Sequence, residues 1–164
     1  ILSYKNILES IAIKKHFVDD DIYENGSRRT LNFGHTLGHS IEALYNKHNK
    51  NIGHGIAVSA GMKLAVIISY NLGLISLLTK IEILNVLSTL FPYISIHKED
   101  YSELLVFMKN DKKNLSEEYR FVLLKEIGMP VIDIPVNHEI LIEALRQYSQ
   151  CNAYTLDGSY LDTF

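Results

Sequence analysis

The stretch LNFGHTLGHSIE, from Leu31 to Glu42, places two histidines and one glutamate at helical spacing. Residues four apart on an α-helix are offset by ~40° and residues seven apart by ~20°, so His35, His39 and Glu42 would share one face. Histidines at this spacing can bind one metal ion, or one can bind metal while the other transfers protons. The same spacing occurs on surface helices whose histidines only form hydrogen bonds, so the motif needs support from the rest of the sequence.

Glycines and other small residues around this stretch indicate close packing. Gly34 and Gly38 lower helix stability, which indicates that another group approaches their backbone closely. A further helix is predicted over residues 54–71, and its many small side chains permit close helix contact. His54 follows a glycine at the start of that helix, at an element end that faces its neighbour, and is a candidate second metal ligand.

The spacing of apolar residues predicts a mainly α protein with a short β-hairpin. Residues 120–124 and 131–135 flank the turn sequence Gly128-Met129-Pro130 and are predicted to be two short strands. No internal repeat or clear linker is present, so one helical domain is predicted over residues 1–150, and no structure is predicted for the tail 151–164. Helices are predicted over residues 4–18, 30–45, 54–71, 76–90, 99–109 and 138–148.

The composition indicates a globular protein with a hydrophobic core. The chain has 164 residues, of which 47% are hydrophobic and 21% are charged, a composition that argues against disorder. Its formal charge of -3 and the lack of a basic stripe make nucleic acid a poor candidate partner. The single cysteine, Cys151, excludes an internal disulfide, and polar residues interrupt the longest apolar stretch, 56–72. We therefore expect a cytoplasmic protein that binds neither membranes nor nucleic acid.

Basic residues outside the histidine stretch are candidates for binding an anion. Lys14 interrupts the apolar stripe of the first predicted helix, where it either snorkels to the edge or points into a polar cavity. The pairs Arg28-Arg29 and Lys112-Lys113 are ordinary surface charges unless the substrate is anionic. Arginine and lysine are the usual partners of phosphate and carboxylate groups.

The longer stretch ENGSRRTLNFGHTLGHSIE, residues 24–42, resembles the signature of the 3-dehydroquinate synthase family. The resemblance covers nearly the whole chain. It implies the helical C-terminal domain of the dehydroquinate synthase-like two-domain fold, with the hairpin near residues 120–135. Further matching positions, at consistent spacing, are His54-Gly55, Gly61-Met62, Gly73-Leu74-Ile75, Asp111-Lys112-Lys113 and Phe121-Val122-Leu123-Leu124.

The resemblance also implies an activity. Enzymes of this family belong to the shikimate pathway of aromatic amino acid biosynthesis and convert 3-deoxy-D-arabino-heptulosonate 7-phosphate into 3-dehydroquinate and phosphate. They use NAD, which carries the hydride, and a divalent metal, commonly zinc, which polarises the hydroxyl group being oxidised. A homodimer is expected for the full-length enzyme.

Individual residues acquire expected roles from the same resemblance. His35 and His54 match two metal ligands, and His39 matches a histidine placed for proton transfer near the substrate. Glu24 matches an acidic proton acceptor. The positions that match substrate-binding residues are Lys14, Arg28, Asn32 and Lys112.

Two parts of the family pattern do not occur in this sequence. The family's third metal ligand, a glutamate, and its NAD-binding α/β domain both precede the stretch that this chain matches. No glycine-rich phosphate loop follows a strand here. We therefore expect the chain alone to be inactive, with an N-terminal NAD domain as its partner, and to bind metal weakly unless Glu42 or another chain completes the site.

Two other interpretations remain open. The first is a related enzyme of the same fold, either another sugar-phosphate cyclase or an iron-dependent alcohol or glycerol dehydrogenase. Lys14, Arg28 and Lys112 favour a phosphorylated sugar-acid substrate over a dehydrogenase substrate, since the dehydrogenases need no basic phosphate pocket. The second is a non-catalytic helical module retained for dimerisation or binding.

Overall fold

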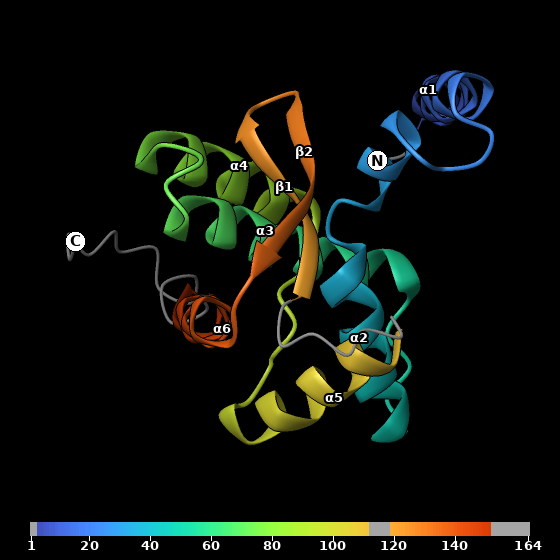
Figure 1. Ribbon diagram of the computed structural model, residues 1–164. Helices are drawn as coiled ribbons and strands as arrows, with labels where there is room; N and C mark the ends of the chain where they lie inside the picture. The colour runs from blue at the N-terminus through green and yellow to red at the C-terminus, as the bar shows by residue number, and fades with distance from the viewer. Residues whose placement is uncertain (1–2, 112–118, 152–164) are drawn as a thin grey trace. The chain divides into compact units, whose positions relative to one another are not determined.

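The chain divides into two compact units, Ile1–Asn32 and Phe33–Phe164, and the computed structural model describes residues 3–111 and 119–151. The first unit contains helix α1, Tyr4–Asp20, and the 3-10 helix η1, Ser27–Asn32 (Figure 1). Ser3 caps α1, because its side-chain oxygen accepts a hydrogen bond of 3.2 Å from the backbone N–H of Asn6. The first predicted helix is thus confirmed and extends to Asp20. The single domain predicted over residues 1–150 spans both units.

The second unit is helical with one β-hairpin, as the sequence predicts. Each predicted helix from residue 54 onward is present, and so are both predicted strands. The tail lies outside the described residues apart from Cys151, which ends the last helix. The elements are α2 (His35–Lys47), α3 (His54–Asn71), α4 (Leu77–Leu90), the 3-10 helix η2 (Lys98–Asp100), α5 (Tyr101–Asp111), β1 (Tyr119–Glu126), β2 (Met129–Val136) and α6 (His138–Cys151).

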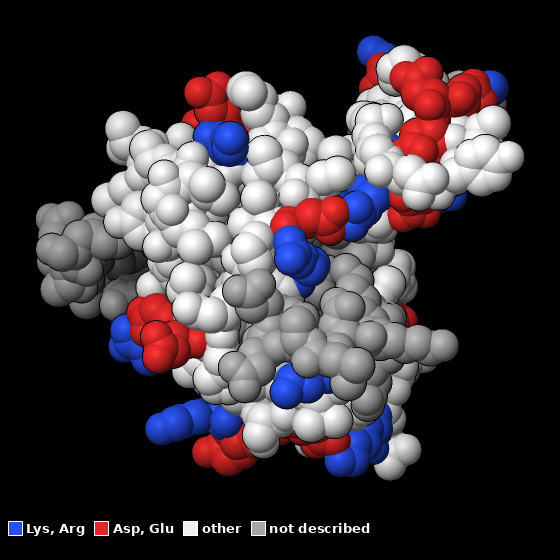
Figure 2. Space-filling model, in the orientation of Figure 1, with Lys and Arg blue, Asp and Glu red and all other residues white. Residues whose placement is uncertain are grey.

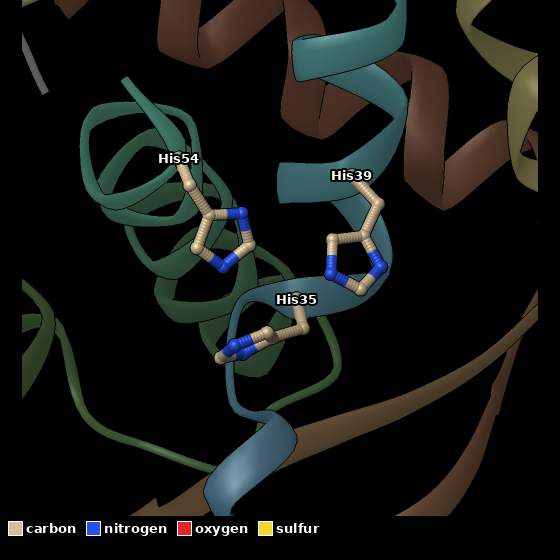
Figure 3. Close-up of side chains that lie close together, drawn as sticks. All are labelled: His35, His39 and His54. Atoms are coloured by element: carbon tan, nitrogen blue, oxygen red, sulfur yellow. The ribbon is translucent and has the colours of Figure 1, made fainter.

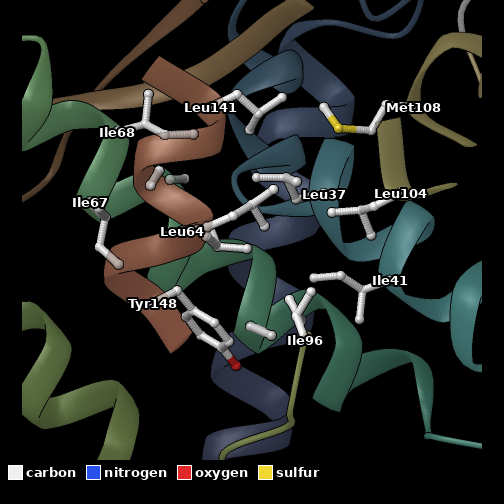
Figure 4. Close-up of a cluster of buried hydrophobic side chains, with 14 of the residues drawn as sticks. Leu37, Ile41, Leu64, Ile67, Ile68, Ile96, Leu104, Met108, Leu141 and Tyr148 are labelled. Carbon is white, nitrogen blue, oxygen red and sulfur yellow. The ribbon is translucent and has the colours of Figure 1, made fainter. Parts of the chain in front are cut away.

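Helix α3 is the centre of this unit and packs against α2, α4, α6 and β1. Most residues between 57 and 69 are buried on every side of α3, which explains why its sequence is apolar all round. Its Leu64 and Ile68 lie in one core cluster with Leu37 of α2 and Leu141 of α6 (Figure 4). None of the described helices is long and apolar enough to cross a membrane.

Glycines allow α2 and α3 to approach each other at the level of the backbone. A Cβ atom on Gly61 of α3 would overlap the carbonyl oxygen of Gly34 and lie 2.7 Å from the backbone nitrogen of Gly38. A Cβ atom on Gly38 would in turn lie 2.8 Å from the Cα atom of Val58. Contacts this close leave no room for a side chain. The close approach expected at Gly34 and Gly38 is confirmed, and the approaching group is α3.

The predicted start of the histidine helix is wrong by several residues. The sequence predicts a helix from Thr30, whereas α2 begins at His35 and residues Ser27–Asn32 form the 3-10 helix η1. Gly34 causes the break, because its φ of 81° lies in the left-handed region and cannot continue a right-handed helix. His35 therefore occupies the first position of α2 rather than its second turn.

A buried serine holds the hairpin against α3. Strands β1 and β2 are antiparallel, with Phe121 opposite Ile134. The backbone N–H of Leu124 in β1 donates to Ser69 Oγ at 3.0 Å, and that hydroxyl donates to the carbonyl of Ala65 at 2.7 Å. Ser69 therefore satisfies a strand N–H that faces the core.

Replacing this serine tests its contribution. Ser69→Ala is expected to lower the free energy of unfolding by about 1–3 kcal/mol, because the N–H of Leu124 loses its acceptor. Ser40→Ala is the matched control. The Ser40 side chain is also buried, but its hydroxyl donates to the Thr36 carbonyl within its own helix, so a loss below about 1 kcal/mol is expected. Urea unfolding measures both values, and equal losses would contradict this role of Ser69.

Candidate metal centre

Three imidazoles converge at the start of two adjacent helices. His35 is the first residue of α2, His39 lies one turn later, and His54 is the first residue of α3. One ligand nitrogen from each ring lies within 4.8 Å of the others. The ring centroids are 5.5 Å apart for His35 and His39, 5.7 Å for His35 and His54, and 5.6 Å for His39 and His54. Figure 3 shows the three rings turned toward one shared space.

The helix packing described above brings these rings together. His35 and His39 need only the helical spacing of α2, but His54 comes from another helix. It meets them because Gly61 and Gly34 let α3 lie directly on the N-terminal end of α2. Sequence reasoning named His35 and His54 as the ligand pair. The structure places His39 at a similar distance, so three imidazoles lie within reach of one ion.

The surroundings of His35 favour a neutral ring. Burial lowers the pKa of His35 below its usual value, and the neighbouring His39 and His54 lower it further. Its Nδ1 atom lies 3.4 Å from the carbonyl oxygen of Phe33, a contact that opposes this decrease in pKa. A histidine binds metal through a neutral imidazole. The lowered pKa therefore keeps His35 in its metal-binding form down to a lower pH than an ordinary histidine.

The three rings fit a divalent transition metal. Imidazole nitrogen suits zinc and similar ions, and a catalytic zinc is held by about three protein ligands with a further position open to water or substrate. Two nitrogens bound to one tetrahedral zinc lie about 3.3 Å apart when each Zn–N bond is about 2.0–2.1 Å. Since the ligand nitrogens already lie within 4.8 Å, small side-chain rotations would bring them to that spacing.

Glu42 contacts the cluster without joining it. Its Oε2 atom lies 2.9 Å from Nδ1 of His54. It does not belong to the group of described residues whose ligand atoms all lie within 4.8 Å of one another. Sequence reasoning offered Glu42 as a substitute metal ligand, whereas in this structure its carboxylate is a hydrogen-bond partner of a histidine.

In the first unit, three of the predicted site residues lie together. Asn32 Nδ2 donates to Glu24 Oε1 at 2.7 Å, and Arg28 Nε lies 3.7 Å from Glu24 Oε2. Glu24 has a φ of 56°, in the left-handed region that non-glycine residues rarely adopt. The predicted proton acceptor is thus held between an amide and a guanidinium group.

Sequence reasoning missed the residue that shapes this loop, Asp21. Its carboxylate accepts hydrogen bonds from the backbone N–H groups of Asn25 (3.0 Å), Gly26 (2.7 Å) and Arg28 (3.1 Å). The hydrogen bond from Gly26 contributes most to a lowered pKa of Asp21. The helix predicted over residues 4–18 ends shortly before Asp21, and no role is predicted for Asp21 from the sequence. The sequence does contain a signal for this role. Asn25-Gly26 is typical of a turn, and an aspartate a few residues before a turn can accept hydrogen bonds from its backbone N–H groups.

The remaining predicted substrate residues are Lys14 and Lys112. Lys14 lies on α1 with an exposed side chain, and α1 has no buried residues. Lys112 lies outside the described residues. On the face that Figure 2 shows, the Lys and Arg side chains that the structure describes are interspersed with Asp and Glu and form no continuous basic stripe.

A mainly helical unit that presents three imidazoles from two adjacent helix starts defines a candidate metal-binding domain. Residues 2–114 match the family described as "3-dehydroquinate synthase C-terminal". The chain belongs to this family. The predicted fold class, a helical C-terminal domain with a short hairpin, is confirmed.

Curated relatives agree with this assignment. A 3-dehydroquinate synthase of Parabacteroides distasonis is 34% identical over 150 residues, which are 90% of this chain and 42% of the relative. A 3-dehydroquinate synthase of Leptospira interrogans is 36% identical over 144 residues, or 86% of this chain and 38% of the relative. One from Staphylococcus carnosus is 36% identical over 84% of this chain and 37% of the relative. The chain therefore spans about two fifths of the length of these relatives.

Solved structures share the fold. A structure of 2-deoxy-scyllo-inosose synthase complexed with carbaglucose-6-phosphate, NAD+ and Co2+ matches with a TM-score of 0.62 and 25% sequence identity. The match covers 77% of this chain and 37% of that one. A second structure of 2-deoxy-scyllo-inosose synthase matches with a TM-score of 0.63 at 23% identity, over 77% of this chain and 34% of that one.

Proposed function

We propose that this chain is the metal- and substrate-binding part of a 3-dehydroquinate synthase, which converts 3-deoxy-D-arabino-heptulosonate 7-phosphate into 3-dehydroquinate and phosphate. The observation that carries the proposal is the cluster of His35, His39 and His54 within 4.8 Å. It occurs in a chain whose family and curated relatives bear the name of that enzyme.

His35 and His54 are the proposed metal ligands. Both are first residues of their helices, and their positions are fixed by the packing of α2 on α3. A bound divalent metal, which we propose to be zinc, supplies a Lewis acid that polarises the hydroxyl group being oxidised. His39 is proposed to transfer a proton at a ring nitrogen facing the same space.

Residues of the first unit have proposed roles of their own. Glu24 is the proposed proton acceptor, with Asn32 and Arg28 holding its carboxylate in place. Arg28 and Asn32 are also proposed to contact the substrate, as are Lys14 and Lys112. Cationic side chains suit its carboxylate and phosphate groups.

The partner regions are proposals of the same kind. The sheet of the described residues is a two-stranded antiparallel hairpin, which differs from the parallel sheet that binds a dinucleotide. We propose that an N-terminal domain binds NAD and supplies the third metal ligand, and that the complete enzyme is a homodimer.

The chain by itself is then expected to release no phosphate from the heptulosonate substrate when NAD+ and zinc are supplied. A phosphate-release assay checks this expectation, and turnover by the chain alone would contradict it.

A second candidate function follows from the structural neighbours. The enzyme crystallised with carbaglucose-6-phosphate, NAD+ and Co2+ is a cyclase with a different named product, so another sugar-phosphate cyclase activity is the alternative for this chain. The names of relatives at 34% and 36% identity favour 3-dehydroquinate synthase over the structural neighbour at 25%.

Ligand binding separates these functions. Calorimetry of the chain with 3-deoxy-D-arabino-heptulosonate 7-phosphate and with carbaglucose 6-phosphate, each with and without zinc, is the test. We expect the heptulosonate to bind more tightly, and zinc to strengthen its binding. A preference for carbaglucose 6-phosphate would favour the other cyclase activity. Binding of neither ligand in a zinc-dependent way would favour a non-catalytic module.

A further inference from the structure

The contact between Glu42 and His54 links the two helices that carry the histidine cluster. Glu42 lies on α2, the helix of His35 and His39, and its Oε2 atom lies 2.9 Å from Nδ1 of His54 at the start of α3. The side chain of Glu42 is 29% exposed and that of His54 is 53% exposed. Glu42 is thus the more sheltered partner and has a fixed place beside the cluster.

The chemistry of the pair determines which nitrogen of His54 carries the proton. An ionised carboxylate has no proton to give, so Nδ1 must be the donor in this hydrogen bond. In a neutral imidazole, a proton on Nδ1 leaves the lone pair on Nε2. Metal-bound histidines commonly donate their other ring N–H to a carboxylate or a backbone carbonyl, which fixes both the tautomer and the orientation of the ring.

A second histidine of the cluster has an oxygen atom in the same place. Nδ1 of His35 lies 3.4 Å from the carbonyl oxygen of Phe33. Two rings from different helices therefore have an oxygen atom close to Nδ1, and in both the Nε2 atom is the one left for another partner. Both rings therefore have, in the metal-free chain, the Nδ1 contact that orients a metal-bound histidine.

We propose that Glu42 is a positioning residue, which holds His54 in the tautomer and orientation that offer Nε2 to the metal. This inference rests on the proposed metal centre. It assigns Glu42 a place beside the ligands rather than among them. It also explains how His54, the first residue of a helix with a side chain more than half exposed, is held toward α2.

The substitution Glu42→Gln removes the charge and preserves the size of the side chain. Zinc affinity, measured by competition with a chromophoric chelator, is expected to fall about 10- to 100-fold. Glu103→Gln is the matched control. Glu103 Oε2 lies 3.9 Å from Nε2 of His48, and its side chain is 26% exposed, so it also pairs with a histidine but outside the cluster. This control is expected to retain the zinc affinity of the original chain.

The tautomer of His54 gives a readout that needs neither metal nor a variant. Nitrogen-15 chemical shifts of the histidine rings in the metal-free chain, recorded above the ordinary pKa of histidine, are expected to show His54 with its proton on Nδ1. A proton on Nε2 would overturn the proposal, even if Glu42→Gln failed to fold. If Glu42 only stabilised the fold, Glu42→Gln would lower the unfolding temperature, but His54 in the original chain would not carry its proton on Nδ1.

The outcomes of the zinc titration distinguish the role of Glu42 from the existence of the metal centre. Unchanged zinc affinity in a folded Glu42→Gln chain would overturn the role of Glu42 and leave the metal centre in place. Because weak binding is expected of this chain alone, the titration extends to a large excess of zinc, and no zinc binding by the original chain even there would overturn both. Weakened binding by Glu42→Gln and undiminished binding by Glu103→Gln would support both.

Discussion

Replacing His35 with alanine is expected to lower the zinc affinity of the chain by on the order of 100-fold or more. Zinc binding to a protein site of about four ligands releases about 10–16 kcal/mol, so one ligand accounts for about 2.5–4 kcal/mol. His54→Ala is expected to have an effect of the same size, because His54 is the second proposed ligand. Chelator competition measures both affinities.

Two further histidine variants test whether the loss of zinc affinity is confined to the proposed ligands. His48→Ala is the control, since His48 lies outside the cluster, and its zinc affinity should equal that of the original chain. His39→Ala tests the proposed division of roles. If His39 transfers protons, its removal should change zinc affinity by less than about 10-fold. A loss as large as that of His35→Ala would make His39 a third ligand instead.

The substitution Gly61→Ala is expected to have the largest effect on the fold around the site. The added methyl group would overlap the carbonyl oxygen of Gly34, and neither backbone can move without separating α3 from α2. Overpacking of this kind costs about 1–3 kcal/mol and occasionally more, and backbone overlap places Gly61→Ala at the upper end, about 3 kcal/mol. Zinc affinity should fall as well, because His54 moves away from His35.

Gly55→Ala provides the comparison on the same helix. A Cβ atom on Gly55 meets no atom within 4 Å, so the methyl group has room. Alanine is the better helix former by about 1 kcal/mol, and Gly55→Ala should leave stability unchanged or raise it slightly. Urea unfolding of the two variants measures the difference. Similar stabilities for both would contradict the backbone contact between α2 and α3.

Much of the fold follows from local sequence patterns. Helices α3, α4, α5 and α6 lie close to their predicted bounds because apolar spacing and flanking turn residues act within a few residues. The start of α2 was missed because its deciding feature is a single torsion angle, the positive φ of Gly34. Helical spacing continues through that glycine in the sequence, although the helix itself does not.

The candidate site was only partly predictable for a different reason. His35, His39 and Glu42 were placed on one face by helical spacing alone, and they do lie on one helix. The group that Glu42 contacts depends on where α3 packs, which no local pattern specifies. The sequence therefore predicted a glutamate near the histidines but not its contact with Nδ1 of His54.

The most direct test of the metal centre is a crystal structure of the chain grown with zinc, with diffraction data collected on both sides of the zinc absorption edge. We predict one anomalous peak in the space shared by the three imidazoles, about 2.0–2.1 Å from a nitrogen of His35 and a nitrogen of His54. His54 should bind through Nε2, with Glu42 on its Nδ1. A zinc-loaded crystal with no peak at these histidines, or with zinc bound only elsewhere on the chain, would contradict the account.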